Sequence, residues 1–329
     1  MANPAKPQSP IARVLLLLAL AFCLTPWASP PIALAIGIVL ALAGLTAWPA
    51  QCKKWSKIAI QAGIVVLGLW ISLQQVAHAG LTGLALSSGA IIVVLVLSLL
   101  LEKLLKPAKD VSTLLASGTA ICGGSAIAAT GTVIGASSGS MSIATAIVFL
   151  LNAVGVYVYP PIGHALDMSE QQFGAWAAIG VHDVAGVVAA AKGYTPRDLA
   201  LEQATVIKLT RVLWIVPVAM VLGWLYRRSQ HTDVKAAKSP FPWFIVMFLA
   251  ACGLRAVLDK TIDSATATEI GNWAKIIASK LLSIALLLIG TGLSRSALRT
   301  VGWRALALGI ILWVCVSVIS LLVVRAVIQ

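Results

Sequence analysis

The chain contains no Asp, Glu, Lys or Arg between Asp110 and Asp167, so a long central stretch carries no formal charge. Over the whole chain, 60% of the 329 residues are hydrophobic and 11% are charged. This composition is too apolar for a water-exposed globular surface, and apolar runs long enough to cross roughly 30 Å of hydrocarbon recur throughout. We therefore predict an all-α polytopic membrane protein, with a single membrane domain over residues 1–329.

These runs predict about eleven transmembrane helices, at residues 12–25, 30–46, 57–75, 88–105, 112–135, 139–160, 172–192, 203–226, 241–258, 272–294 and 301–327. Residues 1–29 then hold an extra N-terminal helix. Because Lys6 and Arg13 precede an apolar stretch that ends in small residues, this segment also fits a secretory signal peptide. The Pro-Pro pair that follows, and the immediate start of another span, favour a retained helix.

The Lys and Arg positions indicate how the helices are oriented, since short cytoplasmic loops collect these residues. With the N-terminus inside, the inner segments hold fifteen of them and the outer segments only Lys192, Arg197, Arg255, Lys260 and Arg325. The sequence therefore predicts a bacterial inner-membrane protein with a cytoplasmic N-terminus and an outer C-terminus. The net charge of +13 comes from these loop clusters rather than from one basic face, so nucleic acid is not a predicted partner.

Without the first helix, ten spans remain, which divide into repeats of five at residues 30–160 and 172–327. A repeat with an odd number of spans enters the membrane from opposite sides in its two copies, so we predict an inverted repeat. The fifth and tenth spans of the chain are both interrupted by glycines, at Cys122–Ser125 and at Gly290–Ser294. Interrupted helices in corresponding positions of two halves point to a binding site near the membrane midplane.

The first candidate site is the break in the fifth span, which consists of small residues: Cys122, Gly123, Gly124, Ser125 and Ala126. The glycine pair lets the helix unwind, and the amides and hydroxyl that follow would face an anion at the positive end of a half-helix. Gly292 would lie at the matching break in the tenth span. Close helix packing through small residues explains the same pattern, so both interpretations stay open.

The seventh and eighth spans hold ionisable residues, which cost about 2.5–3.5 kcal/mol each at the centre of a membrane helix. His182 and Asp183 are neighbours, and His titrates near physiological pH, so this pair suits proton coupling. Lys208 and Arg211 share one helix face and together suit an oxyanion. Alternatively, the His-Asp pair only ties helices together, and a cation only neutralises Asp183.

Signatures of enzymes and cofactors are missing from the sequence. The five Cys residues are scattered without metal-ligand or disulfide spacing, and there is no nucleotide-binding or nucleophile-elbow motif. We therefore predict no cofactor, no metal and no enzyme activity. The predicted partners are a small anionic substrate and the lipid bilayer, and a homo-oligomer stays open.

The chain resembles a known family from about residue 30 onward. Four blocks carry this resemblance: Ile121–Ile127, Val181–Ala190, Ile207–Arg211, and Phe241–Phe244 with the later Gly292-Leu293. On these blocks it resembles the bacterial inner-membrane sulfate exporter family, which is named from genetic context. The family is similar to secondary transporters in which two interrupted helices cross at the substrate site. Relatives more often have His-Glu and Ala-Gln-Val where this chain has His182-Asp183 and Ala185-Gly186-Val187.

The resemblance and the candidate residues together favour a secondary transporter of a small sulfur-containing anion, such as sulfate, sulfite or an organosulfonate. Export is the direction that the family name implies, and His182 with Asp183 would supply proton coupling. The alternative within transport is a sodium/proton antiporter or a sodium-coupled organic anion transporter, with Asp183 as the ion site. From a different class, a membrane-embedded enzyme or a sensory subunit is disfavoured by the missing motifs.

Overall fold

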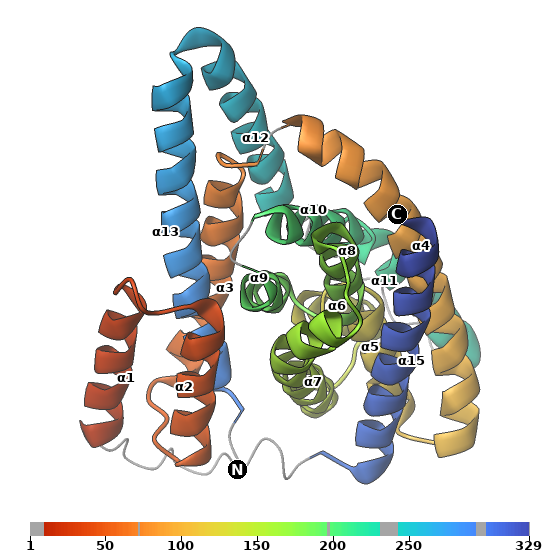
Figure 1. Cartoon of the computed structure of the whole chain (residues 1–329). Coiled ribbons are helices and arrows are strands. Elements are labelled where there is room, and N and C mark those ends of the chain that lie inside the picture. Colours follow the sequence, from red (N-terminus) through yellow and green to blue (C-terminus); the bar gives the residue numbers. More distant parts are fainter. Residues whose placement is uncertain (1–9, 72, 196–197, 231–242, 294–300, 329) are drawn as a thin grey trace. The chain divides into compact units, whose positions relative to one another are not determined.

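The computed structural model describes residues 10–71, 73–195, 198–230, 243–293 and 301–328, and every regular element among them is an α-helix (Figure 1). The helices are α1 (Pro10–Cys23), α2 (Pro30–Leu42), α3 (Pro49–Leu67), α4 (Leu73–Leu105), α5 (Lys109–Ala120), α6 (Gly124–Ile134), α7 (Ser138–Ala165), α8 (Glu170–Gly180), α9 (Val184–Tyr194), α10 (Leu199–Val212), α11 (Ile215–Gln230), α12 (Trp243–Thr261), α13 (Ser264–Gly290) and α15 (Trp303–Val327). The all-α prediction is confirmed for these residues.

Helix length and composition support a polytopic membrane protein. Within the described ranges, four helices are long and apolar enough to cross a membrane, and the bent pair α10–α11 makes a fifth if it is one span. Several remaining predicted spans correspond to helices too short to cross alone, such as α6 and α9. The predicted total of eleven spans and the inverted repeat therefore stay predictions.

The chain divides into two compact units, which we call unit 1 (Met1–Ser72 with Met247–Leu298) and unit 2 (Leu73–Val246 with Arg299–Gln329). Both units combine segments from the two halves of the sequence. The predicted repeats at 30–160 and 172–327 do not coincide with these boundaries. One membrane domain that holds both units stays a prediction.

Unit 1 is built around α13, which packs against α2 and α3. Glycines allow α2 and α13 to approach closely, since a β-carbon on Gly37 would lie 2.2 Å from the Leu287 carbonyl oxygen. A β-carbon on Gly290 would likewise lie 2.7 Å from the carbonyl oxygen of Leu34. Backbone-to-backbone contact of this kind is how small residues hold membrane helices together.

The predicted interruption of the tenth span, at Gly290–Ser294, lies at the end of a helix. Helix α13 runs without interruption from Ser264 to Gly290, and Thr291 follows as its C-cap. Gly292 and Leu293 lie just beyond this end, and Ser294 lies outside the described residues. Gly290 thus ends a helix and admits α2, and an interrupted tenth span stays a prediction.

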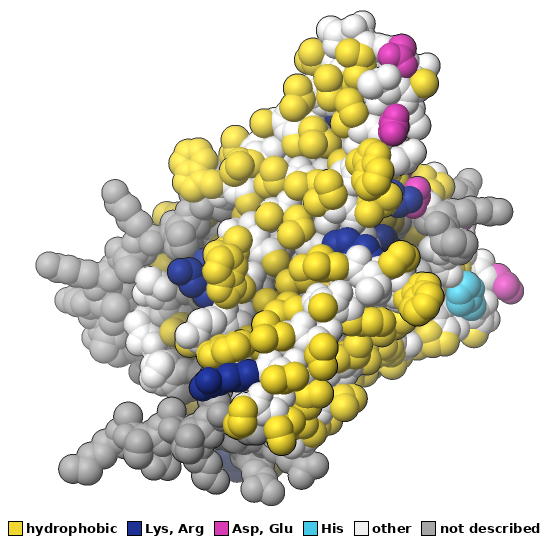
Figure 2. All heavy atoms as spheres, turned by 90° about the vertical axis from the view of Figure 1, so that its left-hand side faces the viewer, with side chains coloured by type: hydrophobic (Ala, Val, Ile, Leu, Met, Phe, Trp, Pro, Cys, Tyr) yellow, Lys and Arg dark blue, Asp and Glu magenta, His cyan; other side chains and the backbone are white. Residues whose placement is uncertain are grey.

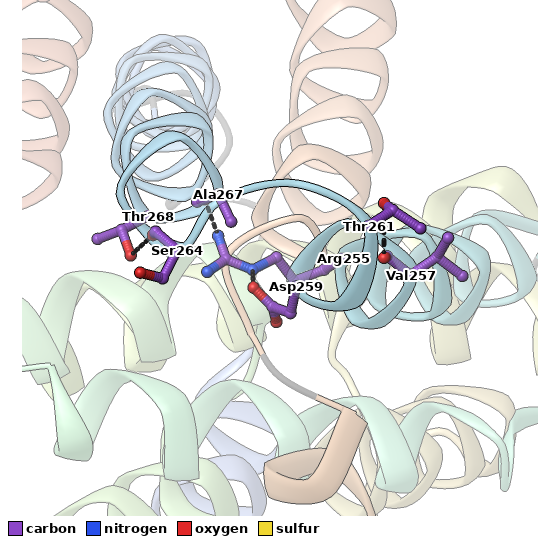
Figure 3. A network of polar contacts seen from close by, with 7 residues as sticks. All are labelled: Arg255, Val257, Asp259, Thr261, Ser264, Ala267 and Thr268. Atoms are coloured by element: carbon purple, nitrogen blue, oxygen red, sulfur yellow. Dashed lines mark hydrogen bonds and ion pairs between the residues drawn. The ribbon is translucent and has the colours of Figure 1, made fainter.

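At its other end, α13 forms a hairpin with α12 that polar contacts close (Figure 3). Arg255 donates to the Ala267 carbonyl and pairs with Asp259 at 3.0 Å. Asp263 caps α13 by accepting from the Thr266 amide at 2.8 Å, and this hydrogen bond lowers the pKa of the exposed Asp263 carboxyl. The cap therefore stays formed until the pH falls below the usual range for Asp.

Hydrophobic side chains dominate the surface that Figure 2 shows, with Lys and Arg confined to a few places. Exposed apolar residues occur on α1, α2 and α13, and include Leu17, Leu18, Val39, Ile276 and Ile277. A water-soluble surface does not expose apolar side chains at this density. The exposed faces of these helices therefore suit contact with lipid.

Unit 2 has a core in which α5, α6, α7 and α15 meet. Its buried residues include Leu114 and Leu115 from α5, Ile127 from α6, Val148 from α7 and Leu308 from α15. Two of its helix pairs, α5/α6 and α8/α9, are each separated by a short non-helical segment. These two breaks carry most of the sequence-predicted site residues.

Candidate functional site

The first break, between α5 and α6, lies where the sequence predicts it. Helix α5 ends at Ala120 and α6 begins at Gly124, with Gly123 at φ 70° and ψ −120°. Backbone of this kind is open to glycine and strained for residues with a β-carbon. Across the turn, the Cys122 thiol and the Ser125 hydroxyl are hydrogen-bonded at 2.7 Å. The glycine pair is therefore a turn, as predicted, and not only a helix-packing surface.

Replacing Gly123 with Ala is expected to lower the free energy of unfolding by about 1–3 kcal/mol, because the new side chain would be held at positive φ. The added carbon would also lie 3.0 Å from Val148. Unfolding of the purified protein by SDS in mixed micelles measures this loss. Gly89→Ala in α4 is the matched control, since its β-carbon meets nothing within 4 Å; equal losses in both variants would contradict the role of the turn.

The second break, between α8 and α9, corrects the prediction of a continuous seventh span with His182 and Asp183 inside a helix. Helix α8 ends at Gly180, and Val181 is extended with φ −80° and ψ 131°. Asp183 then begins α9 as its N-cap by accepting from the Gly186 amide. An Asp side chain accepts hydrogen bonds from backbone amides and is therefore favoured at the start of a helix. Asp183 is the residue in the sequence that indicates this second helix start.

Asn152 of α7 fixes Asp183 from the side. Its Nδ2 donates to the Asp183 carboxylate at 2.8 Å, and its Oδ1 accepts from the Asp183 amide at 3.0 Å. A β-carbon on Gly186 would lie 2.6 Å from both of these Asn152 atoms. Gly186 thus leaves room for Asn152, which is the structural consequence of the sequence difference noted at this position.

Asn152→Ala is expected to lower the free energy of unfolding by about 1.5–3 kcal/mol, because it removes a hydrogen bond to a buried carboxylate. Thermal unfolding in detergent, followed by tryptophan fluorescence, measures the change. Asn272→Ala on the exposed side of α13 is the control and should unfold like the unmodified protein. A loss no larger than that of the control would show that Asp183 does not need Asn152.

The two breaks lie against each other within unit 2. A β-carbon on Gly123 would lie 3.5 Å from the β-carbon of His182. His182 is 2% exposed, and neither of its ring nitrogens has a hydrogen-bond partner among the described residues. Buried polar groups are nearly always paired, so an unpaired imidazole at the junction of two broken helices suits a ligand-binding role.

Lys208 and Arg211 of α10 both reach this junction and are fully buried. Lys208 Nζ donates to the carbonyls of Val181 at 2.7 Å and Ala178 at 3.2 Å. These carbonyls lie at the C-terminal end of α8, where a helix leaves its carbonyls unpaired and carries partial negative charge. Lys208 therefore neutralises the end of a half-helix.

Arg211 does the same for two half-helices at once. Its Nη2 donates to the Thr119 carbonyl at 2.8 Å, its Nε donates to the Ala120 carbonyl, and its Nη1 donates to the Ile179 carbonyl. Two of the three Lys208 donors and three of the five Arg211 N–H groups thus bind backbone carbonyls, and anion binding by these residues stays a prediction. In the described part of the chain, neither cation forms an ion pair with Asp183 either.

Four half-helix ends meet at the breaks, and three of them carry a countercharge. Arg211 and Lys208 place positive charge at the C-terminal ends of α5 and α8, and Asp183 places negative charge at the N-terminal end of α9. The N-terminal end of α6 has no side-chain cap and no acidic residue in its first turn. Such an end carries partial positive charge and is suited to an anion.

The formal charges around this end do not cancel. Two buried cations, Lys208 and Arg211, stand against one buried carboxylate, Asp183, which leaves one positive charge while His182 is neutral. The carbonyls at the helix ends offset part of this charge, and a bound anion would offset the rest and stabilise the site. Ser125, in the first turn of α6, is exposed and gives an approach to this end.

Most of the predicted site residues thus lie together in unit 2: Cys122, Gly123, Gly124, Ser125, Ala126, His182, Asp183, Lys208 and Arg211. Gly292 belongs to unit 1, and its part in this site stays a prediction. Of the four sequence blocks that carried the family resemblance, Phe241 and Pro242 lie outside the described residues.

The sequence matches the family model described as "Conserved hypothetical protein 698" over residues 10–326. A UPF0324 membrane protein of Bacteroides thetaiotaomicron is 39% identical over 296 residues, covering 90% of this chain and 86% of the relative. UPF0324 membrane proteins of Bdellovibrio bacteriovorus and Vibrio parahaemolyticus are 35% and 37% identical, covering 94% and 92% of this chain and 93% and 95% of the relatives. No solved structure matches the chain. The chain therefore belongs to the conserved hypothetical protein 698 family, whose relatives here are named UPF0324 membrane proteins.

Proposed function

We propose that this protein is a secondary transporter of a small anion, which binds at the uncapped N-terminal end of α6. The observation that carries the proposal is that this end alone, of the four that meet at the two breaks, has neither a cap nor a countercharge. The excess positive charge of Lys208 and Arg211 over Asp183 supports an anion rather than a cation there. Irregular backbone buried at membrane depth is also characteristic of transporter binding sites.

Sulfate, sulfite or an organosulfonate is the substrate class that we propose, with export from a bacterial inner membrane as the direction. A helix N-terminus recognises tetrahedral oxyanions through its amides, and the Ser125 hydroxyl adds a donor. The resemblance to the sulfate exporter family points to the same class. Coupling would use protons, and the eleven-span inverted topology with an outer C-terminus is part of this proposal.

A cation-binding function is less favoured by the surroundings of Asp183. Its carboxylate already accepts from Asn152 and from the Gly186 amide, and two buried cations lie on the neighbouring α10. A sodium ion would add positive charge to a site that already has an excess. The sodium/proton antiporter and the sodium-coupled anion transporter are therefore outcomes that the experiment must exclude.

The test places a fixed negative charge at the proposed anion position. Ser125→Asp should weaken sulfate binding by about tenfold or more, because its carboxylate repels the anion at short range. It should not destabilise the fold, since an acidic side chain is favourable in the first turn of a helix. Ser125→Asn is the matched neutral control and should keep most of the affinity.

Sulfate binding is measured by calorimetry on purified protein in detergent, and flux is measured in liposomes with and without sodium. Equal sulfate affinity in the Asp and Asn variants would place the anion elsewhere. No anion binding in the unmodified protein, together with sodium flux that needs no anion, would replace the proposed function with cation antiport. Sulfate flux that requires sodium would favour the sodium-coupled alternative.

A further inference from the structure

We propose that His182 takes up one proton whenever the site binds a dianion, and stays neutral when it binds a monoanion. This inference rests on the proposed anion-transport function and adds to it the charge class of the substrate and the group that carries the proton. Tetrahedral oxyanions that carry two negative charges, such as sulfate, would then be transported together with a proton. Monoanions of the same shape would move without one.

The first reason is that His182 has unused hydrogen-bonding capacity. Both of its ring nitrogens are buried without a partner, and the ring is attached beside Gly123, the N-cap of α6. A neutral imidazole can donate one hydrogen bond and an imidazolium can donate two. Additional protonation therefore adds both a charge and a donor next to the proposed anion position.

The second reason is that the other ionisable groups around His182 are already engaged. Asp183 accepts from Asn152 and from the Gly186 amide, and both hydrogen bonds require an acceptor oxygen. Lys208 and Arg211 on α10 donate to the carbonyls at the ends of α5 and α8. Protonation of Asp183, or loss of a proton from either cation, would weaken these structural hydrogen bonds.

Two further titratable groups come from elements packed at the junction. Tyr159 of α7 is hydrogen-bonded to Ser317 of α15. The Cys122 thiol at the first break is hydrogen-bonded to Ser125, and a change in its protonation would also change the charge of the site. A Cys122→Ser variant distinguishes this thiol from His182 as the group that takes up the proton.

The charges of the site then set the proton requirement. Lys208 and Arg211 exceed Asp183 by one positive charge, which a monoanion balances with His182 neutral. A dianion leaves one negative charge unbalanced unless His182 is protonated. Because a proton on His182 and a dianion beside it attract each other, each makes the binding of the other more favourable.

Sulfate and methanesulfonate are the probes, because both present tetrahedral sulfur–oxygen groups while carrying two charges and one charge, respectively. Each is added to the purified full-length protein in weakly buffered detergent, and a pH indicator measures proton uptake while calorimetry measures binding. We expect about one proton per bound sulfate and none per methanesulfonate. Sulfate affinity should rise by about tenfold per pH unit of acidification in the range where His182 is neutral without the anion.

His182→Asn should bind sulfate more weakly, without proton uptake and with little pH dependence, whereas methanesulfonate affinity should not depend on pH in either protein. His164→Asn is the matched control, because this exposed histidine stacks on Tyr194 and should leave proton uptake intact. Methanesulfonate binding also shows that the His182 variant is folded. If the variant does not fold, proton uptake by the unmodified protein still shows whether a dianion binds together with a proton and a monoanion without one.

Three results would overturn the inference. The unmodified protein could bind sulfate without a proton, the His182 variant could keep taking up a proton with sulfate, or Cys122→Ser could be the variant that loses proton uptake. In each case an anion still binds, so the proposed function stands. Failure of the unmodified protein to bind either probe would instead contradict the proposed function itself.

Discussion

Arg211→Met is expected to lower the free energy of unfolding by about 3–5 kcal/mol, the cost typical of removing one partner from a buried charged network. The guanidinium group donates to three carbonyls, those of Thr119, Ala120 and Ile179, which belong to two different half-helices. Met fills similar space and offers no donor. Buried backbone carbonyls would be left unpaired at both helix ends, where water cannot replace the lost donors.

The SDS-unfolding midpoint of the purified protein measures this loss. Arg228→Met in α11 is the matched control, because Arg228 is exposed and contacts the Trp224 ring rather than backbone carbonyls. The control should unfold within about 0.5 kcal/mol of the unmodified protein. Similar losses in the two variants would show that the carbonyl contacts of Arg211 do not hold the broken helices in place.

Lys208→Met is expected to have the second largest effect, which combines a structural and an electrostatic part. Two carbonyls at the end of α8, those of Ala178 and Val181, would lose their donor, at a cost of about 2–4 kcal/mol. The site would also lose its excess positive charge. Sulfate affinity should therefore fall by more than about tenfold, which corresponds to 1.4 kcal/mol or more.

Unfolding and calorimetry together separate these two parts. Lys260→Met is the control, since Lys260 is exposed in the last turn of α12 and should affect neither measurement. A Lys208 variant that is destabilised but binds sulfate with unchanged affinity would remove this cation from the electrostatics of the site. A stable variant without binding would instead show that its carbonyl contacts contribute little to the fold.

The sequence predicted the first helix break because its signal is local. A glycine pair in an uncharged stretch allows the positive φ that Gly123 adopts, and no other part of the chain is needed to recognise it. The break at Val181–Asp183 was missed because its apolar flanks look continuous. Asp183 begins a new helix there, and Asn152, which is 31 positions away, fixes it in place.

The glycines after α13 show where a local signal is ambiguous. Gly290 and the residues after it look like the first break in sequence, and Gly290 both ends α13 and admits the backbone of α2. Glycine permits both a turn and a close helix approach, and the local sequence does not distinguish the two. Only the neighbouring helix decides which of them occurs.

The sequence by itself determined that this protein is apolar, helical and polytopic, and it located the ionisable residues that must be accommodated at membrane depth. These properties follow from composition and from helix length against bilayer thickness. The tertiary structure decided what those residues do. Lys208 and Arg211 bind carbonyls that are 27 to 92 positions away, and so place positive charge at the ends of half-helices. The reason is that a buried cation pairs with the acceptors that packing brings to it, and long-range packing is not encoded in the residues beside it.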